Sequence, residues 1–158
     1  MLHQKPITPM ITRRHLLCAL CAAPLAATPA FAGGPAIFAQ GGIAIGGVDP
    51  VGYFTDARPV AGSAQFRLKW RSAIWHFASH DHRDMFERNP HRFAPRYGGF
   101  CAMSMSQGGV SNSIPEAWGM HEGRLYLTHS LTAIDQWRRD PAAYVAQADG
   151  HWPTVFCE

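Results

Sequence analysis

Few of the motifs that mark common enzyme classes occur in this 158-residue sequence, and cysteine is scarce. Four cysteines are present, and only Cys101 and Cys157 lie beyond the first 32 residues. Those later residues contain no C-x-x-C pair, no H-E-x-x-H, no glycine-rich phosphate loop and no G-x-S-x-G. These absences argue against a zinc protease, a phosphate-loop enzyme and an α/β-hydrolase.

Excess charge and long apolar runs are also missing once the first 32 residues are set aside. The sequence has 14 basic and 11 acidic residues, and Lys5, Arg13 and Arg14 precede residue 33, so 11 of each sign remain. The remaining arginines are scattered among acidic residues, so we expect no nucleic-acid partner. The nearly uncharged run over residues 15–32 contains two prolines and falls short of the roughly 20 residues that a membrane-spanning helix needs.

The first 32 residues have the three parts of a secretion signal. Basic residues come first, the nearly uncharged run follows, and Ala30-Phe31-Ala32 ends the segment. The run Thr12-Arg13-Arg14-His15-Leu16-Leu17 is similar to a twin-arginine signal, which directs the export of folded chains, often with a metal or cofactor bound. We therefore expect cleavage after Ala32, a periplasmic location, no membrane anchor after cleavage, and a single domain over residues 33–158.

An internal repeat emerges when the sequence from residue 33 onward is shifted by 51 positions. The pairs that align without a gap include Trp75 with Tyr126, Ser79 with Ser130, Phe86 with Trp137, Pro90 with Pro141 and Phe93 with Tyr144. Each copy begins with a pattern typical of a β-hairpin, over residues 66–77 and 117–128. The sequence thus predicts an α+β fold: a small sheet of β-hairpins with two helices, built from a duplicated hairpin-helix unit.

A serine after each predicted hairpin marks the start of a helix. Ser79 and Ser130 can each cap the free amides of a first turn, and Asn89-Pro90 and Asp140-Pro141 should end the two helices. Glycine and serine are frequent in residues 97–113, which we therefore expect to form a loop. Short strands that extend the sheet are predicted before the first copy, over residues 37–39, 43–45 and 53–54.

Three segments resemble the YHS domain, a small module found in copper-transporting ATPases, some multicomponent hydroxylases and a set of exported bacterial proteins. Residues 74–93, I-W-H-F-A-S-H-D-H-R-D-M-F-E-R-N-P-H-R-F, resemble its strand-helix unit, and Asp49-Pro50-Val51-Gly52 resembles the D-P-V-C segment before that unit. Residues 96–102, with Gln107-Gly108 and Glu116-Ala117-Trp118 after them, resemble the exported subfamily. The resemblance covers most of residues 37–153, and it implies a YHS-type fold and the handling of a metal ion.

The sequence departs from this family at the positions where the ATPase-linked domains place thiols. Gly52, Ala78 and His82 stand there, so a soft-metal site has lost its sulfur at these positions. In the second copy, His129 occupies the position of Ala78. The candidate ligands near the family's functional positions are therefore Cys101, His129 and His82, for copper or another transition metal.

Cys101 follows Gly98-Gly99 in the expected loop, where backbone amides can approach the sulfur. Such amides, or a nearby imidazolium, would lower the pKa of the thiol and favour the reactive thiolate. A buried core residue and a disulfide with Cys157 fit the sequence equally well. Met103 and Met105 alternate as on a short strand, where they would either add thioether ligands for copper or pack in the core.

Three functions are compatible with the sequence. The leading hypothesis is a periplasmic module that binds or senses a soft metal such as copper through Cys101, His129 and His82, without catalysis. The alternative is a thiol redox enzyme with Cys101 as catalytic nucleophile and Cys157 as resolving thiol. The third is a structural domain that binds a protein partner and performs no chemistry of its own.

Overall fold

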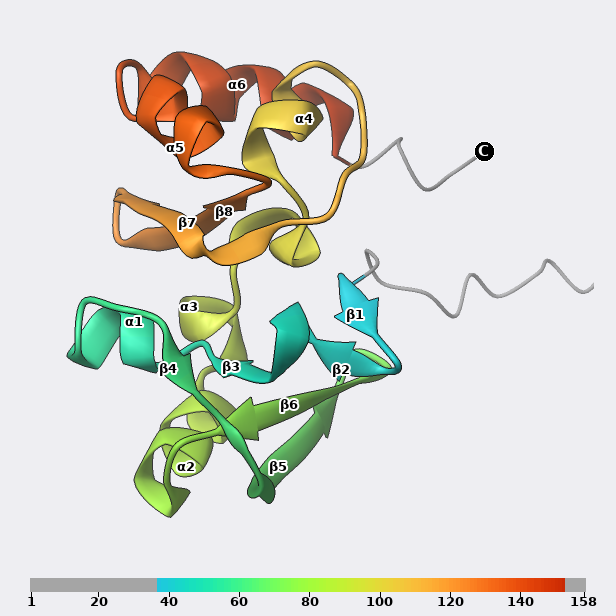
Figure 1. Cartoon of the computed structure of the whole chain (residues 1–158), viewed down its shortest axis with the longest axis vertical. Helices are drawn as coiled ribbons and strands as arrows, with labels where there is room; N and C mark the ends of the chain where they lie inside the picture. The colour runs from blue at the N-terminus through green and yellow to red at the C-terminus, as the bar shows by residue number, and fades with distance from the viewer. Residues whose placement is uncertain (1–36, 153–158) are drawn as a thin grey trace, which may run out of the picture. The chain divides into compact units, whose positions relative to one another are not determined.

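Residues 37–152 are described by a computed structural model, and they form an α+β fold (Figure 1). The mixed class predicted from the sequence is confirmed. This part of the chain combines short helices with three small sheets of four, two and two strands. The predicted secretion signal, its cleavage after Ala32, and Cys157 lie outside the described residues. Within residues 37–152, no helix has both the length and the apolar composition to cross a membrane.

The first predicted hairpin is present, and short strands before it extend its sheet. β5 (Ser63–Trp70) and β6 (Ala73–Phe77) pair antiparallel around a turn at Arg71 and Ser72, whose φ angles are 49° and 65°. The sheet order β1-β2-β6-β5 is completed by β1 (Ala39–Gln40) and by β2 (Ile43–Ala44), which runs parallel to β6. Of the strands expected over residues 37–39 and 43–45, the first is present but covers Ala39–Gln40, and the second ends at Ala44.

Tyr53 and Phe54, predicted as a strand, lie instead in the short helix α1 (Gly52–Thr55). The elements around it are the 3-10 turn η1 (Ile45–Gly47) and the paired strands β3 (Val48–Asp49) and β4 (Val60–Ala61). Oδ1 of Asp49 accepts a hydrogen bond from the amide of Val51 at 2.8 Å, a local bond that turns the chain into the helix. This turn overrides the strand preference of the two aromatic residues.

Ser79 begins the first predicted helix, α2 (His80–Arg88), by accepting a hydrogen bond from the amide of His82 at 3.2 Å. The helix stops before Asn89-Pro90, as predicted, and its Phe86 is buried. The proline then begins a further helix, α3 (Pro90–Phe93), with Asn89 as its N-cap. Proline suits this position because the first turn of a helix has no partner for the missing N–H.

The second copy has the same order of elements. β7 (Ile114–His121) and β8 (Arg124–Thr128) form the predicted hairpin, and Ser130 caps α5 (Leu131–Trp137) through the amide of Ala133. Pro141 then begins α6 (Pro141–His151), with Asp140 as the N-cap. Pro90 therefore closely follows one helix and begins another, whereas α5 already ends at Trp137, three residues before Asp140, so Pro141 only begins a helix. Sequence analysis predicted neither helix that the prolines begin.

Two helical elements lie within residues 96–106, so the loop predicted over residues 97–113 is wrong there, whereas residues 107–113 do form a turn and irregular chain. The 3-10 turn η2 (Arg96–Gly99) contains the left-handed residues Tyr97, Gly98 and Gly99, and α4 (Ala102–Ser106) follows it. α4 packs against α6 and buries most of its side chains. A helix of five residues is too short to form alone, so tertiary packing stabilises it.

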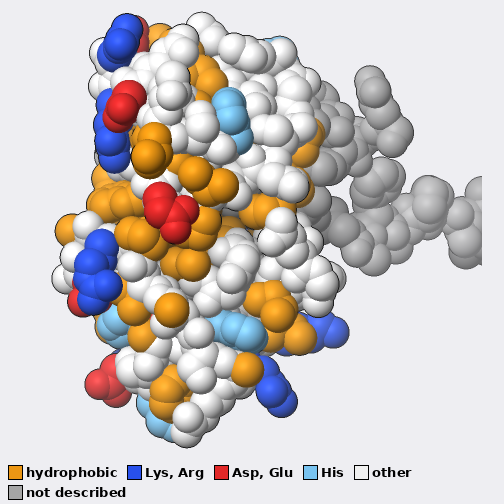
Figure 2. Space-filling view, in the orientation of Figure 1, with side chains coloured by type: hydrophobic (Ala, Val, Ile, Leu, Met, Phe, Trp, Pro, Cys, Tyr) orange, Lys and Arg blue, Asp and Glu red, His pale blue; other side chains and the backbone are white. Residues whose placement is uncertain are grey.

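Two hydrophobic clusters define an N-terminal half (residues 37–95) and a C-terminal half (residues 96–152). Successive residues of β8 alternate between the clusters, since Leu125 and Leu127 belong to the first and Tyr126 to the second. The β7-β8 hairpin therefore lies between the two cores (Figure 1). Figure 2 shows hydrophobic side chains gathered in a band at the level of β7 and α1, where the halves meet.

Candidate functional site

Cys101 lies directly before α4 and acts as the N-cap of that helix. Its backbone is extended, and its Sγ accepts a hydrogen bond from the amide of Ser104 at 3.4 Å. The amide of Cys101 donates to the carbonyl of Ser111, and the hydroxyl oxygens of Ser104 and Ser111 lie 2.7 Å apart. The segment that carries the thiol is therefore tied both to α4 and to the chain that follows it.

The end of β8 brings His129 to this thiol. Cys101 forms a parallel β-bridge with Leu127, and His129 comes two residues later, after the strand ends at Thr128. Sγ of Cys101 and Nδ1 of His129 lie 3.2 Å apart, which is hydrogen-bond distance for sulfur. Two of the predicted site residues, 28 positions apart in the sequence, are thus in direct contact.

Hydrogen bonds lower the pKa of the Cys101 thiol. Burial is the largest single influence and acts in the opposite direction, because it disfavours the charged thiolate. The hydrogen bonds from Ser104 and His129 stabilise the thiolate, and together they outweigh burial. The pKa therefore lies below the ordinary value for cysteine, which favours the reactive form of the sulfur.

The thiol is buried, so the expectation of an open, glycine-lined loop is wrong. Cys101 is 0% exposed, whereas the His129 side chain beside it is exposed. The burial arises because Cys101 caps a packed helix and pairs with β8, so both elements cover it. The imidazole is thus the member of the pair that faces solvent.

Met103 and Met105 lie on α4, so the strand predicted for them is also wrong. Both side chains are buried in the hydrophobic cluster of the C-terminal half. Of the two interpretations of these methionines, the structure favours packing. The alternation expected to place both sulfurs beside the thiol has no counterpart on a helix, where residues two apart face different sides.

His82 lies in the first turn of α2, where it contacts Asp49 and not Cys101. Its Nδ1 lies 2.6 Å from Oδ2 of Asp49, a carboxylate that is 0% exposed. Among residues 37–152, no three His, Cys, Asp or Glu side chains are grouped so that they could hold a metal ion. The predicted set of three ligands is therefore corrected to the pair Cys101 and His129, because Asp49 holds the imidazole of His82 elsewhere.

Cys157, the predicted resolving thiol, lies outside the described residues, and Cys101 is free.

Sequence analysis missed the role of Asp49. Its carboxylate accepts hydrogen bonds from the amides of Val51 and Ala78, both at 2.8 Å, in addition to the contact with His82. The available signal was the Asp-Pro pair itself, because aspartate before a turn often bonds the amide two residues on. The bond to Ala78, 29 positions away, had no sequence signal.

Comparison with known proteins gives no match. No family model, no curated protein and no solved structure is significantly similar to the chain. The chemistry of this site is therefore inferred from its own geometry.

Proposed function

We propose that this protein is an exported, redox-responsive thiol protein of the YHS type, in which Cys101 is the nucleophile and His129 accepts its proton. The 3.2 Å contact between Sγ and Nδ1 carries the proposal. A base within hydrogen-bond reach of the thiol is one of the arrangements that activate a nucleophilic cysteine, and this pair has it. The lowered pKa of Cys101 supports the same assignment.

Reversible oxidation by a hydroperoxide is the reaction that suits this pair. The Cys101 thiolate attacks one peroxide oxygen, and the O–O bond breaks as the S–O bond forms. The departing hydroxide, or the alkoxide of an organic hydroperoxide, takes the proton held by His129 and leaves as water or as the alcohol, while Cys101 becomes a sulfenic acid. A second thiol can then condense with the sulfenic acid to give a disulfide and water, and Cys157 is the candidate within this chain.

Burial of the thiol limits which oxidants can reach it. Because Cys101 is 0% exposed under an exposed imidazole, a small hydroperoxide should react more readily than a bulky one. The same burial protects the sulfur from nonspecific modification. This arrangement suits a sensor of small oxidants better than an enzyme that binds a large thiol substrate.

The pH dependence of Cys101 alkylation tests this function. The chain used is full-length, with Cys18, Cys21 and Cys157 replaced by serine. We expect its rate of alkylation by iodoacetamide to rise with pH, and the midpoint of that rise to lie at a lower pH than for the same chain unfolded in urea. His129→Gln keeps the size of the side chain but removes the imidazole. It should raise the midpoint and slow oxidation by hydrogen peroxide at pH 7 about tenfold, the effect of losing one hydrogen bond to a charged group.

The matched control is His80→Gln, which replaces an exposed histidine packed on Phe66 and should change neither rate nor midpoint. Trapping of a Cys101 sulfenic acid by a 1,3-dione, detected by mass spectrometry, should accompany oxidation. The proposal is wrong if the midpoint equals that of the unfolded chain, or if no sulfenic acid can be trapped.

Binding of a soft metal ion such as copper is the second candidate, and the same two atoms support it. With bond lengths of about 2.3 Å to sulfur and 2.1 Å to nitrogen, two ligands of a tetrahedral metal lie about 3.6 Å apart. The 3.2 Å distance between Sγ and Nδ1 is close to that separation. Metal analysis of the exported protein and of Cys101→Ser tests it, since bound metal is expected in the first alone, and equal contents would exclude this function.

A further inference from the structure

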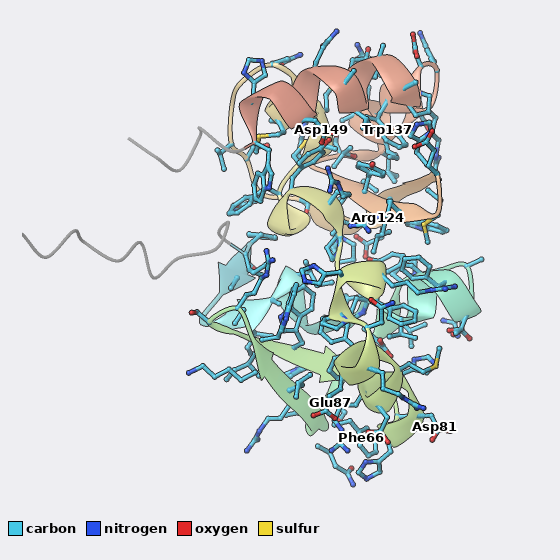
Figure 3. All side chains as sticks on the ribbon, turned by 180° about the vertical axis from the view of Figure 1, so that it is seen from behind. Phe66, Asp81, Glu87, Arg124, Trp137 and Asp149 are labelled. Carbon is cyan, nitrogen blue, oxygen red and sulfur yellow. The ribbon has the colours of Figure 1, made fainter. Side chains whose placement is uncertain are left out.

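A cavity of about 230 Å³ is lined by residues of both halves, away from the residues of the thiol pair. Trp70 and Arg71, at the turn of the first hairpin, form one side. Arg124, the first residue of β8 after the turn of the second hairpin, forms another, and Arg96 comes from the segment that joins the halves. Figure 3 shows Arg124 at the side of the C-terminal half that faces the N-terminal half, with Asp149 on α6 beyond it.

Three guanidinium groups line this cavity, and only one has a carboxylate partner among the described residues. Nη2 of Arg96 lies 2.7 Å from Oδ1 of Asp149. Arg71 and Arg124 form no ion pair within residues 37–152. The cavity wall therefore carries excess positive charge, which favours an anionic occupant.

Two buried nitrogens of this wall have no hydrogen-bond partner in the described part of the chain. They are the Nε atoms of Arg96 and Arg124. A buried donor without an acceptor destabilises a fold, and a small turn of either guanidinium toward the cavity would let its enclosed Nε donate to a ligand oxygen. A guanidinium presents Nε and Nη as a planar fork that matches the oxygens of a carboxylate or a phosphate.

Aromatic and apolar side chains complete the lining and set the size of the occupant. The guanidinium of Arg71 lies 4.8 Å from the centroid of the Trp70 ring, which favours a stacked position for this cation. Trp152, Ile37 and Pro95 add apolar surface. The volume is smaller than the about 300–1,000 Å³ of sites for drug-sized ligands, so the occupant has only a few carbon atoms.

We infer that this cavity binds a small organic anion through carboxylate or phosphate oxygens, which Arg124, Arg96 and Arg71 contact. Arg124 is the central residue, because it combines a buried unpaired Nε with the absence of an ion pair in the described residues. The inference is independent of the proposed redox function, since neither Cys101 nor His129 lines the cavity.

Titration of the full-length chain with citrate and with inorganic phosphate tests the site, by calorimetry and by tryptophan fluorescence. Citrate represents the carboxylates, phosphate represents the phosphorylated ligands, and glycerol is the uncharged control. We expect saturable binding of at least one anion, none of glycerol, and weaker binding as salt is added. Arg124→Gln should weaken binding about tenfold, because a charged hydrogen-bond donor is lost.

Arg71→Gln provides a second variant in which folding is not at risk, because Arg71 is exposed, and it should weaken binding about threefold. Arg88→Gln is the matched control. Its Nε donates to the carbonyl of Asp84 on α2, and it does not line the cavity, so affinity should not change. Lack of binding of both anions at millimolar concentration, or equal affinity in the Arg71 and Arg124 variants and the unaltered chain, would overturn the inference.

Discussion

Each half of the molecule contains a hairpin followed by two helices, yet the halves place different polar pairs beside the ends of their hairpins. In the N-terminal half, His82 contacts the carboxylate of Asp49, which also accepts the amide of Ala78 just after β6. In the C-terminal half, His129 contacts the thiol of Cys101 just after β8. Asp49 precedes the short helix α1, and Cys101 precedes the short helix α4. Each accepts a hydrogen bond from a backbone amide at or near the start of that helix, that of Val51 or of Ser104.

The two pairs differ in how fully the acceptor is satisfied. Asp49 accepts two amides and an imidazole, and the His82 side chain is only 18% exposed. Cys101 accepts one amide and an imidazole that is exposed. A carboxylate surrounded in this way stabilises the fold, whereas a thiol beside a solvent-facing base is suited to react. Similar positions in the two halves are thus suited to different tasks, which replacement of Asp49 and of Cys101 can separate.

Replacement of Asp49 should produce the largest effect. Asp49→Ala leaves the amides of Val51 and Ala78 without their acceptor and His82 without its partner, so we expect a loss of about 3–5 kcal/mol of unfolding free energy. Urea unfolding measures the loss. As a control, Asp135→Ala removes an exposed carboxylate paired with Arg138 and should cost less than about 0.5 kcal/mol. A similar small loss at Asp49 would contradict a structural role for the first pair.

Methyl groups added to one glycine in each half should produce intermediate effects. A Cβ at Gly62 would lie 2.7 Å from backbone atoms of Gly47 and His76, whereas one at Gly119 would lie 2.9 Å from the ring of Trp137. Backbone relaxes less easily than a side chain, so we expect Gly62→Ala to lose about 3 kcal/mol and Gly119→Ala about 1–2 kcal/mol. Urea unfolding of both variants gives the comparison.

The control for both variants is Gly150→Ala, on a surface of α6 with nothing near the new methyl group. It should gain about 0.5–1 kcal/mol, because alanine favours a helix over glycine. A larger loss at Gly119 than at Gly62 would show that the C-terminal half is the more tightly packed of the two.

The pH dependence of stability should show the smallest effect, and it should come from the second pair. Because the fold lowers the pKa of Cys101, its thiolate stabilises the folded state fully above the ordinary value of 9.0, and this contribution is lost as pH falls through the lowered pKa. The difference in unfolding free energy between the Cys157→Ser chain and the same chain with Cys101→Ser should therefore grow as pH rises toward 9, then level off. A difference that shrinks as pH rises would contradict the lowered pKa.

Much of the secondary structure could be predicted because its causes are local. Ser79 and Ser130 bond amides three residues ahead, within a single helical turn. The prolines at 90 and 141 act on the residue before them by a local clash. Both kinds of signal can be read in a few consecutive residues. The helices α1 and α4 had weaker local signals, since α1 depends on the Asp49 turn and α4 on packing against α6.

The sequence by itself determined the mixed α+β class, the two hairpins and the starts of α2 and α5, because short-range hydrogen bonds and alternating patterns specify them. It also singled out Cys101, His129 and His82 as candidate site residues. Only the tertiary structure decided which of them meet. The ends of β8 and η2 bring one imidazole to the thiol, and the buried carboxylate of Asp49 holds the other imidazole in the opposite half. Contacts between residues 28 and 33 positions apart depend on how the hairpins pack, which no local pattern encodes.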